Sequence, residues 1–125
     1  MKILVVDDSA LDRKLLIRIL MKAELPQEIL QAQDGEEALT VLAEHYQDIG
    51  LVMLDWQMPK MSGIELMAGM ARIPILASIP VVMVTASGSD ENKKLAREVN
   101  PGLAGYIVKP YKAEELLETI KPYLK

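Results

Sequence analysis

The chain begins MKILVVDDSALDRKL (residues 1–15), where a short apolar run is followed at once by two adjacent acids. The aliphatic run Ile3–Val6 is typical of a buried strand in a parallel sheet. Asp7 and Asp8 end this strand, because carboxylates are poor strand formers and neighbouring negative charges repel each other. Taken alone, the pair is a polar turn before a helix. A functional site would require a positive partner from elsewhere in the chain.

The residues after the acid pair predict a helix. Ser9 is a candidate N-cap, and Asp12 three residues later makes a weaker form of the capping box. Apolar residues recur at helical spacing through Ala10–Ala23, while arginines and lysines occupy other positions, as in an amphipathic helix. Pro26 then ends the pattern. The opening stretch therefore predicts a strand, an acidic turn and a helix in direct succession.

Length and composition restrict the possible classes of protein. We expect the 125 residues to form one domain, residues 1–125, with enough apolar residues for a substantial core. The absence of cysteine excludes disulfides and thiolate chemistry. The net charge of -4 gives no basic footprint for nucleic acid. No apolar run approaches the roughly 20 residues of a membrane helix, and no secretory signal is visible. We therefore expect a cytoplasmic protein that contacts neither nucleic acid nor membrane directly.

Four further apolar runs are predicted to be strands, and helical patterns separate them. The predicted strands, with the first at Met1–Val6, continue with Glu28–Gln33, Ile49–Leu54, Val81–Val84 and Gly105–Val108. The helices after the first are Glu36–His45, Gly63–Arg72, Glu91–Val99 and Ala113–Ile120. Pro74 and Pro122 are read as helix terminators. Five strands alternating with five helices predict a doubly wound α/β fold, in which helices cover both faces of a parallel sheet.

Reactive side chains follow four of the predicted strands. Asp7 and Asp8 follow the first strand, Asp55 the third, Thr85 the fourth and Lys109 the fifth. In a doubly wound sheet, ligands bind outside the carboxyl ends of the strands, where the strand order reverses. If the order is 2-1-3-4-5, three carboxylates, a hydroxyl and an ammonium meet at one edge of the sheet.

Such a cluster predicts a metal and a reaction. Three close carboxylates need a cation, and Mg²⁺ suits them because it prefers oxygen ligands and keeps several waters. A carboxylate beside Mg²⁺, a lysine and a hydroxyl is placed to attack phosphorus and form an acyl phosphate. The residues therefore predict a magnesium-dependent phosphoryl acceptor.

Four motifs in order, VVDDS (5–9), VMLDWQMPKMSG (52–63), VVMVTAS (81–87) and GYIVKPY (105–111), resemble the receiver domain of two-component response regulators. The resemblance covers essentially the whole chain. By length it is strongest to stand-alone receivers of the chemotaxis (CheY-like) type. It implies a flavodoxin-like (βα)5 fold with the strand order 2-1-3-4-5.

The resemblance implies roles for the acids and their neighbours. Asp55 would be the phosphoacceptor. Asp7, Asp8 and Asp55 would hold Mg²⁺ together with the backbone carbonyl of Gln57. Gln57 and Ser87 would flank the path of an attacking water and so tune the reaction rates.

The resemblance also implies the groups that respond to the phosphoryl group. Thr85 would donate a hydrogen bond to it, and Lys109 would form an ion pair with it. The Lys109–Pro110 peptide bond would be cis. Tyr106 would be the switch aromatic that turns inward when Thr85 moves.

The implied function is a phosphorylation switch. A sensor histidine kinase or a histidine phosphotransfer protein would supply the phosphoryl group. A downstream output protein would bind the face formed by Glu91–Val99, Gly105–Val108 and Ala113–Ile120. The protein would catalyse only its own phosphorylation and dephosphorylation, and would not be an enzyme with an external substrate.

Three alternatives remain open. The chain would look the same if it were a receiver cut from a larger response regulator or hybrid kinase. A phosphatase of the haloacid dehalogenase type also phosphorylates a strand-end aspartate, but it needs a second aspartate where this chain has Gln57. A flavodoxin-like cofactor binder should cradle phosphate in its first loop, whereas Asp7 and Asp8 would repel it.

Overall fold

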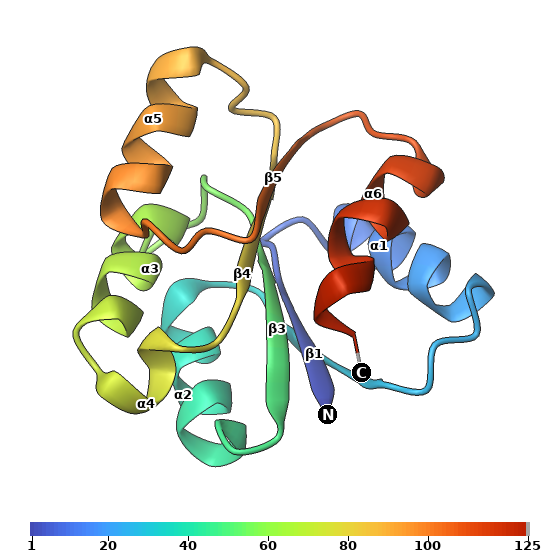
Figure 1. Ribbon diagram of the computed structural model, residues 1–125, viewed down its shortest axis with the longest axis horizontal. Helices are drawn as coiled ribbons and strands as arrows, with labels where there is room; N and C mark the ends of the chain where they lie inside the picture. The colour runs from blue at the N-terminus through green and yellow to red at the C-terminus, as the bar shows by residue number, and fades with distance from the viewer. Residues whose placement is uncertain (125) are drawn as a thin grey trace.

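The computed structural model describes residues 1–124, so Lys125, the last residue of the expected domain, lies outside them. All five strands pair in parallel in a single sheet of order β2-β1-β3-β4-β5, which confirms the predicted doubly wound fold (Figure 1). The strands are β1 (Lys2–Val6), β2 (Glu28–Ala32), β3 (Ile49–Leu54), β4 (Val81–Thr85) and β5 (Gly105–Val108).

The helices follow the predicted order with one addition. They are α1 (Ala10–Lys22), α2 (Gly35–His45), α3 (Gly63–Ala71), α4 (Pro74–Ala77), α5 (Asp90–Val99), α6 (Ala113–Ile120) and a 3₁₀ turn, η1 (Lys121–Tyr123). Every predicted element is present, and its ends differ from the prediction by no more than one residue.

The expectation of five helices is wrong, because α4 is a sixth α-helix within residues 1–124. Pro74 and Pro122 do end the helices before them, but each also lies in the first turn of the next helical segment. Proline suits that position because it has no N–H to satisfy and its φ angle is already helical. Each of these two prolines therefore marks the start of one helical segment as well as the end of another.

Helices cover both faces of the sheet. In Figure 1, α1 and α6 lie on one side of it, and α2, α3, α4 and α5 lie on the other. Side chains of β1 alternate between the two sides: Ile3 and Val5 pack with α1 and α6, and Leu4 and Val6 pack with α2 and α3. Because β1 is buried on both faces, its sequence is a continuous apolar run.

The described helices are all too short or too polar to cross a lipid bilayer.

Candidate functional site

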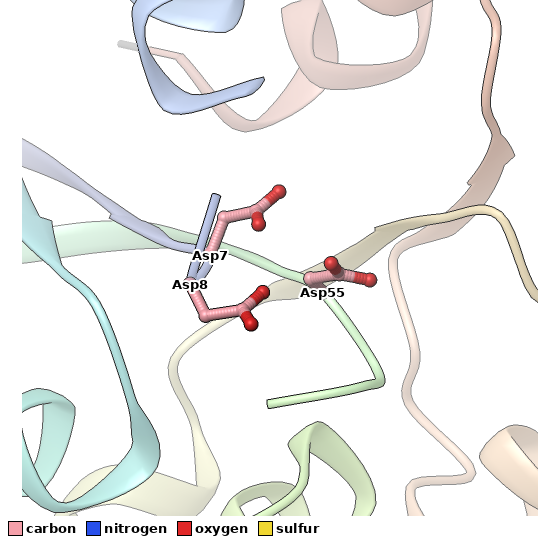
Figure 2. A group of neighbouring side chains, drawn as sticks. All are labelled: Asp7, Asp8 and Asp55. Atoms are coloured by element: carbon pink, nitrogen blue, oxygen red, sulfur yellow. The ribbon is translucent and has the colours of Figure 1, made fainter. Parts of the chain in front are cut away.

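Three carboxylates project into one space at the carboxyl end of the sheet (Figure 2). Asp7 and Asp8 follow β1 directly, and Asp55 follows β3, the strand that pairs with β1. One carboxylate oxygen from each of the three lies within 4.8 Å of the others. Asp8 is exposed, whereas the side chains of Asp7 and Asp55 are only 8% and 11% exposed. The arrangement brings together the three acids that the sequence selected.

Each buried carboxylate has one oxygen held by the backbone. Asp7 Oδ1 accepts a hydrogen bond from the N–H of Ser9 at 2.9 Å, and Asp55 Oδ1 accepts one from the N–H of Trp56 at 2.7 Å. Arg13 also donates to the backbone carbonyl of Asp7. These bonds orient the two carboxylates, so that the Oδ2 atom of each is the one that faces Lys109.

Lys109 is the positive partner that the acid pair requires. Its Nζ lies 2.7 Å from Asp7 Oδ2, 2.9 Å from Asp12 Oδ2 and 3.4 Å from Asp55 Oδ2. A lysine ammonium has three N–H donors, so each has a carboxylate acceptor. The peptide bond that follows, Lys109–Pro110, is cis, the geometry that the resemblance implies.

The electrostatics leave the site short of positive charge. Burial raises the pKa of Asp7, and the nearby charge of Asp55 adds to this, although hydrogen bonds from Lys109 and Ser9 act in the opposite direction. Burial alone would lower the pKa of Lys109, but its hydrogen bonds to Asp7 and Asp12 and the charge of Asp55 raise it above its ordinary value. The lysine therefore stays charged while the acids around it remain in excess.

A hydroxyl and a phenol are joined beside this cluster. Thr85 is the last residue of β4 and is 2% exposed, and its Oγ1 accepts the backbone N–H of Ser87 at 3.2 Å. The Tyr106 hydroxyl donates to the backbone carbonyl of Ser87. Burial and the charge of Asp55 raise the pKa of Tyr106, so its phenol remains a neutral donor. Thr85 and Tyr106 thus contact the same short backbone segment.

The loop after β3 is packed tightly against the start of α3. The N–H of Gly63 donates to the carbonyl of Trp56 at 2.8 Å. A Cβ atom at residue 63 would lie 2.1 Å from the backbone oxygen of Asp55, so only glycine fits there. Gln57 lies exposed in this loop, two residues after Asp55. The end of the loop at Gly63 is therefore held against its beginning at Asp55 and Trp56.

Asp12 is the site residue that sequence reasoning missed. From the sequence, Asp12 is expected to act only at the helix cap, and its N–H does bond to Ser9 Oγ at 3.1 Å. Its carboxylate points instead to Lys109, which lies 97 residues away in the chain. The one available signal was an acid in the first turn after a strand-end acid pair, which is too common in helices to suggest a site.

The chain matches the family model described as "Response regulator receiver domain" over residues 3–121. The chain belongs to the response regulator receiver family. It is 37% identical over 123 residues to the phosphate regulon transcriptional regulatory protein PhoB of Pseudomonas aeruginosa, which covers 98% of this chain and 51% of PhoB. It is 32% identical over 124 residues to a chemotaxis protein CheY homolog of Campylobacter jejuni, covering 99% of this chain and 92% of that protein. The receiver thus spans about half the length of its PhoB relatives.

Solved structures agree with this assignment. The receiver superposes on the chemotaxis protein CheY4 of Vibrio cholerae with a TM-score of 0.85 at 32% identity, covering 98% of both chains. A CheX–CheY–BeF3–Mg²⁺ complex from Borrelia burgdorferi gives a TM-score of 0.87 at 30% identity, covering 100% of this chain and 90% of that one. Receiver domains are phosphoacceptor switches that bind Mg²⁺ at an acidic pocket. The oxygen donors of Asp7, Asp8 and Asp55 suit that ion.

Proposed function

We propose that this receiver accepts a phosphoryl group on Asp55 from a sensor histidine kinase or a histidine phosphotransfer protein. The observation that supports this most is the convergence of Asp55 with Asp7, Asp8 and Lys109 at one edge of the sheet. A buried carboxylate held by the Trp56 N–H is oriented for attack, and the surrounding groups match the charge that a phosphoryl group brings.

Asp7, Asp8 and Asp55 would hold Mg²⁺ together with the backbone carbonyl of Gln57. Three close carboxylates repel one another, and a hard cation with oxygen ligands would relieve this repulsion. When bound, the ion would neutralise charge on the phosphoryl oxygens during transfer.

The transfer step conserves atoms and electrons. One carboxylate oxygen of Asp55 forms a bond to phosphorus as the P–N bond of the phosphohistidine breaks. The electron pair of that bond leaves with the imidazole nitrogen, which is then available for a proton from solvent. Lys109 places positive charge beside the transferred group. The product is an aspartyl phosphate at residue 55 and a free histidine on the donor.

The switch would run from Asp55 to Tyr106 through Thr85. The Thr85 hydroxyl would turn to donate to a phosphoryl oxygen, and Lys109 would pair with the same group. Because Thr85 and Tyr106 both contact Ser87, movement of the hydroxyl alters the backbone that holds the phenol. The phosphoryl charge would thus shift the population of a second conformation of this segment.

Reversal would be slow hydrolysis within the same site. A water oxygen attacks phosphorus, the bond from phosphorus to Asp55 breaks, and the carboxylate and inorganic phosphate are released. Gln57 and Ser87 would flank the path of this water and set its rate. Neither side chain carries charge, and the chemistry acts only on the protein's own aspartate.

The output surface would be the face formed by α5, β5 and α6. Tyr106 belongs to β5, so a change at this residue reaches that face directly. The match over 92% of a CheY homolog supports a single receiver domain, residues 1–125, which would act in the cytoplasm. Its net charge of -4 argues against direct contact with nucleic acid. The match to half of PhoB supports the alternative, a receiver within a larger regulator. A chemotaxis role belongs to the first of these proposals.

The test is incubation with acetyl phosphate and Mg²⁺, followed by intact mass measurement. The wild type should gain one phosphoryl group, and the Asp55→Asn variant should gain none. Asp48→Asn is the matched control, because Asp48 is exposed and precedes the same strand at its opposite end. An unmodified wild type would overturn the proposal, and turnover of many phosphate monoesters would favour the phosphatase instead.

A further inference from the structure

We propose that Asp12 is a positioning residue that competes with the phosphoryl group for the ammonium of Lys109. This inference rests on the proposed function, because it concerns how readily Lys109 reaches a phosphorylated Asp55. It assigns to the first turn of α1 a part in setting the phosphorylation equilibrium.

The Asp12 carboxylate is directed to Lys109 because the local helix cap does not use it. In a complete capping box, this side chain would accept the N–H of Ser9. That N–H instead donates to Asp7 Oδ1 at 2.9 Å. The Asp12 Oδ2 atom lies 2.9 Å from Lys109 Nζ, closer than the Oδ2 atom of Asp55 at 3.4 Å. In the resting protein, Lys109 is therefore held more closely by Asp12 than by the acceptor.

The three donors of Lys109 are occupied, and only the longest contact, at 3.4 Å, is to Asp55, the residue that would carry the phosphoryl group. A second donor reaches the phosphoryl oxygens only if Lys109 gives up Asp7 or Asp12. Asp7 and Asp55 belong to the three-carboxylate cluster that would share a cation, whereas Asp12 lies outside it. Among the residues of the site, Lys109 is therefore the positive partner of Asp12. Its side chain is 38% exposed, so water can replace the lysine when it leaves. Asp12 is the partner that a phosphoryl group would displace most readily.

The competition has a definite direction. Lys109 can turn fully toward a phosphoryl group on Asp55 only by giving up its shorter contact with Asp12. Removing the Asp12 charge removes that cost, so the phosphorylated state should become more populated. Because a part-exposed ion pair is weak, we expect an effect of about two- to five-fold on beryllofluoride affinity and on phosphoryl lifetime.

The test compares Asp12→Asn with Glu37→Gln. Glu37, like Asp12, is an acid at the third position of a helix, but it is exposed and belongs to α2 on the opposite face of the sheet (Figure 1). Beryllofluoride in the presence of Mg²⁺ is titrated against each variant, and the decay of acetyl phosphate-labelled protein is followed by mass. Asp12→Asn should bind about two- to five-fold more tightly and decay correspondingly more slowly, and Glu37→Gln should match the wild type.

A double-mutant cycle separates this role from a general effect of charge. In a Lys109→Met background, or in Lys109→Gln if that variant folds better, Asp12→Asn should change beryllofluoride affinity no further. If the two-fold or greater effect persists there, Asp12 acts by repelling anions and the inference is overturned.

A third readout needs neither metal nor phosphoryl group. In metal-free protein, acetylation of Lys109 by an activated acetyl ester, followed by peptide mass, should be faster in Asp12→Asn than in the wild type. Equal labelling would overturn the inference. If the wild type accepts phosphoryl but Asp12→Asn binds beryllofluoride no better, only this inference fails. If the wild type binds neither beryllofluoride nor phosphoryl, the proposed function fails with it.

Discussion

Two lysines in this receiver each face more than one carboxylate, but in different surroundings. Lys109 lies within 3.4 Å of three acids, and its side chain is 17% exposed. Lys60 belongs to the loop between β3 and α3 and lies 3.9 Å from Asp34 and 3.7 Å from Glu36, and its side chain is 59% exposed. Distance and burial set the contribution of an ion pair to stability, because water and salt screen the exposed pairs of Lys60 but reach the pairs of Lys109 poorly.

The largest expected effect is the loss of the inner lysine. Lys109→Met leaves the buried Asp7 and Asp55 without their shared partner, and we expect the metal-free protein to lose about 2–4 kcal/mol of unfolding free energy at pH 7. Urea unfolding measures this loss. Lys60→Met is the matched control and should change stability by no more than about 0.5 kcal/mol. Equal losses of stability in the two variants would show that burial of the Lys109 ion pairs does not strengthen them.

Mg²⁺ should stabilise the protein through the acids around Lys109 and not through those around Lys60. At a concentration of about 100 times its dissociation constant, the ion should stabilise the wild type by about 2.7 kcal/mol. Asp8→Asn should weaken this response because it removes a proposed ligand, whereas Glu36→Gln should leave it intact. Fluorescence of Trp56, whose backbone N–H donates to Asp55 Oδ1, should follow the same titration. A flat titration, or equal weakening in both variants, would contradict the predicted site.

Alkaline pH should have a smaller effect on the stability that Lys109 contributes. The pKa of Lys109 is raised above the ordinary 10.5, so the folded state holds this proton more tightly than the unfolded state. The stability that Lys109 contributes is fully present below pH 10.5, and it is lost as the pH rises through the raised pKa of Lys109 in the folded state. The stability difference between wild type and Lys109→Met should therefore stay constant from pH 8 to pH 10. Above pH 10.5 the difference should shrink as the pH rises, and a difference that stays constant there would mean that Lys109 has the same pKa in the folded and unfolded states.

The smallest expected effect is that of salt on the outer pair. Raising the ionic strength to about 1 M shortens the screening length to about 3 Å, so the contribution of Lys60 should vanish. Urea unfolding of Lys60→Met and wild type at low and high salt measures this directly. The difference should fall from at most about 0.5 kcal/mol to none. A Lys60 contribution that grows with salt would show that the stability comes from packing of the Lys60 methylene groups and not from its charge.

The order of elements was predictable because each buried strand is a local apolar run that ends in a polar residue. Ile3–Val6 and Asp7 show this most clearly, since burial on both faces requires an unbroken run and a charge must end it. α4 was missed because Pro74 has the same local signature whether it ends one helix or begins the next.

The candidate site was predictable in its members but not in its contacts. Strand-end position indicated Asp55, Thr85 and Lys109, since the carboxyl ends of neighbouring parallel strands meet. It could not indicate that Lys109 contacts Asp12, because this contact depends on where α1 begins relative to the end of β5.

By itself, the sequence determined the strand order along the chain, the ends of the strands to within one residue and the identity of the acids at one edge, because these follow from local hydrophobic periodicity and from the high cost of burying charge within a strand. Only the tertiary structure decided which carboxylate oxygen faces which nitrogen. Residues 7, 12, 55 and 109 approach within hydrogen-bond reach through packing across the sheet, and contacts between residues so distant in the chain leave no periodic trace in it.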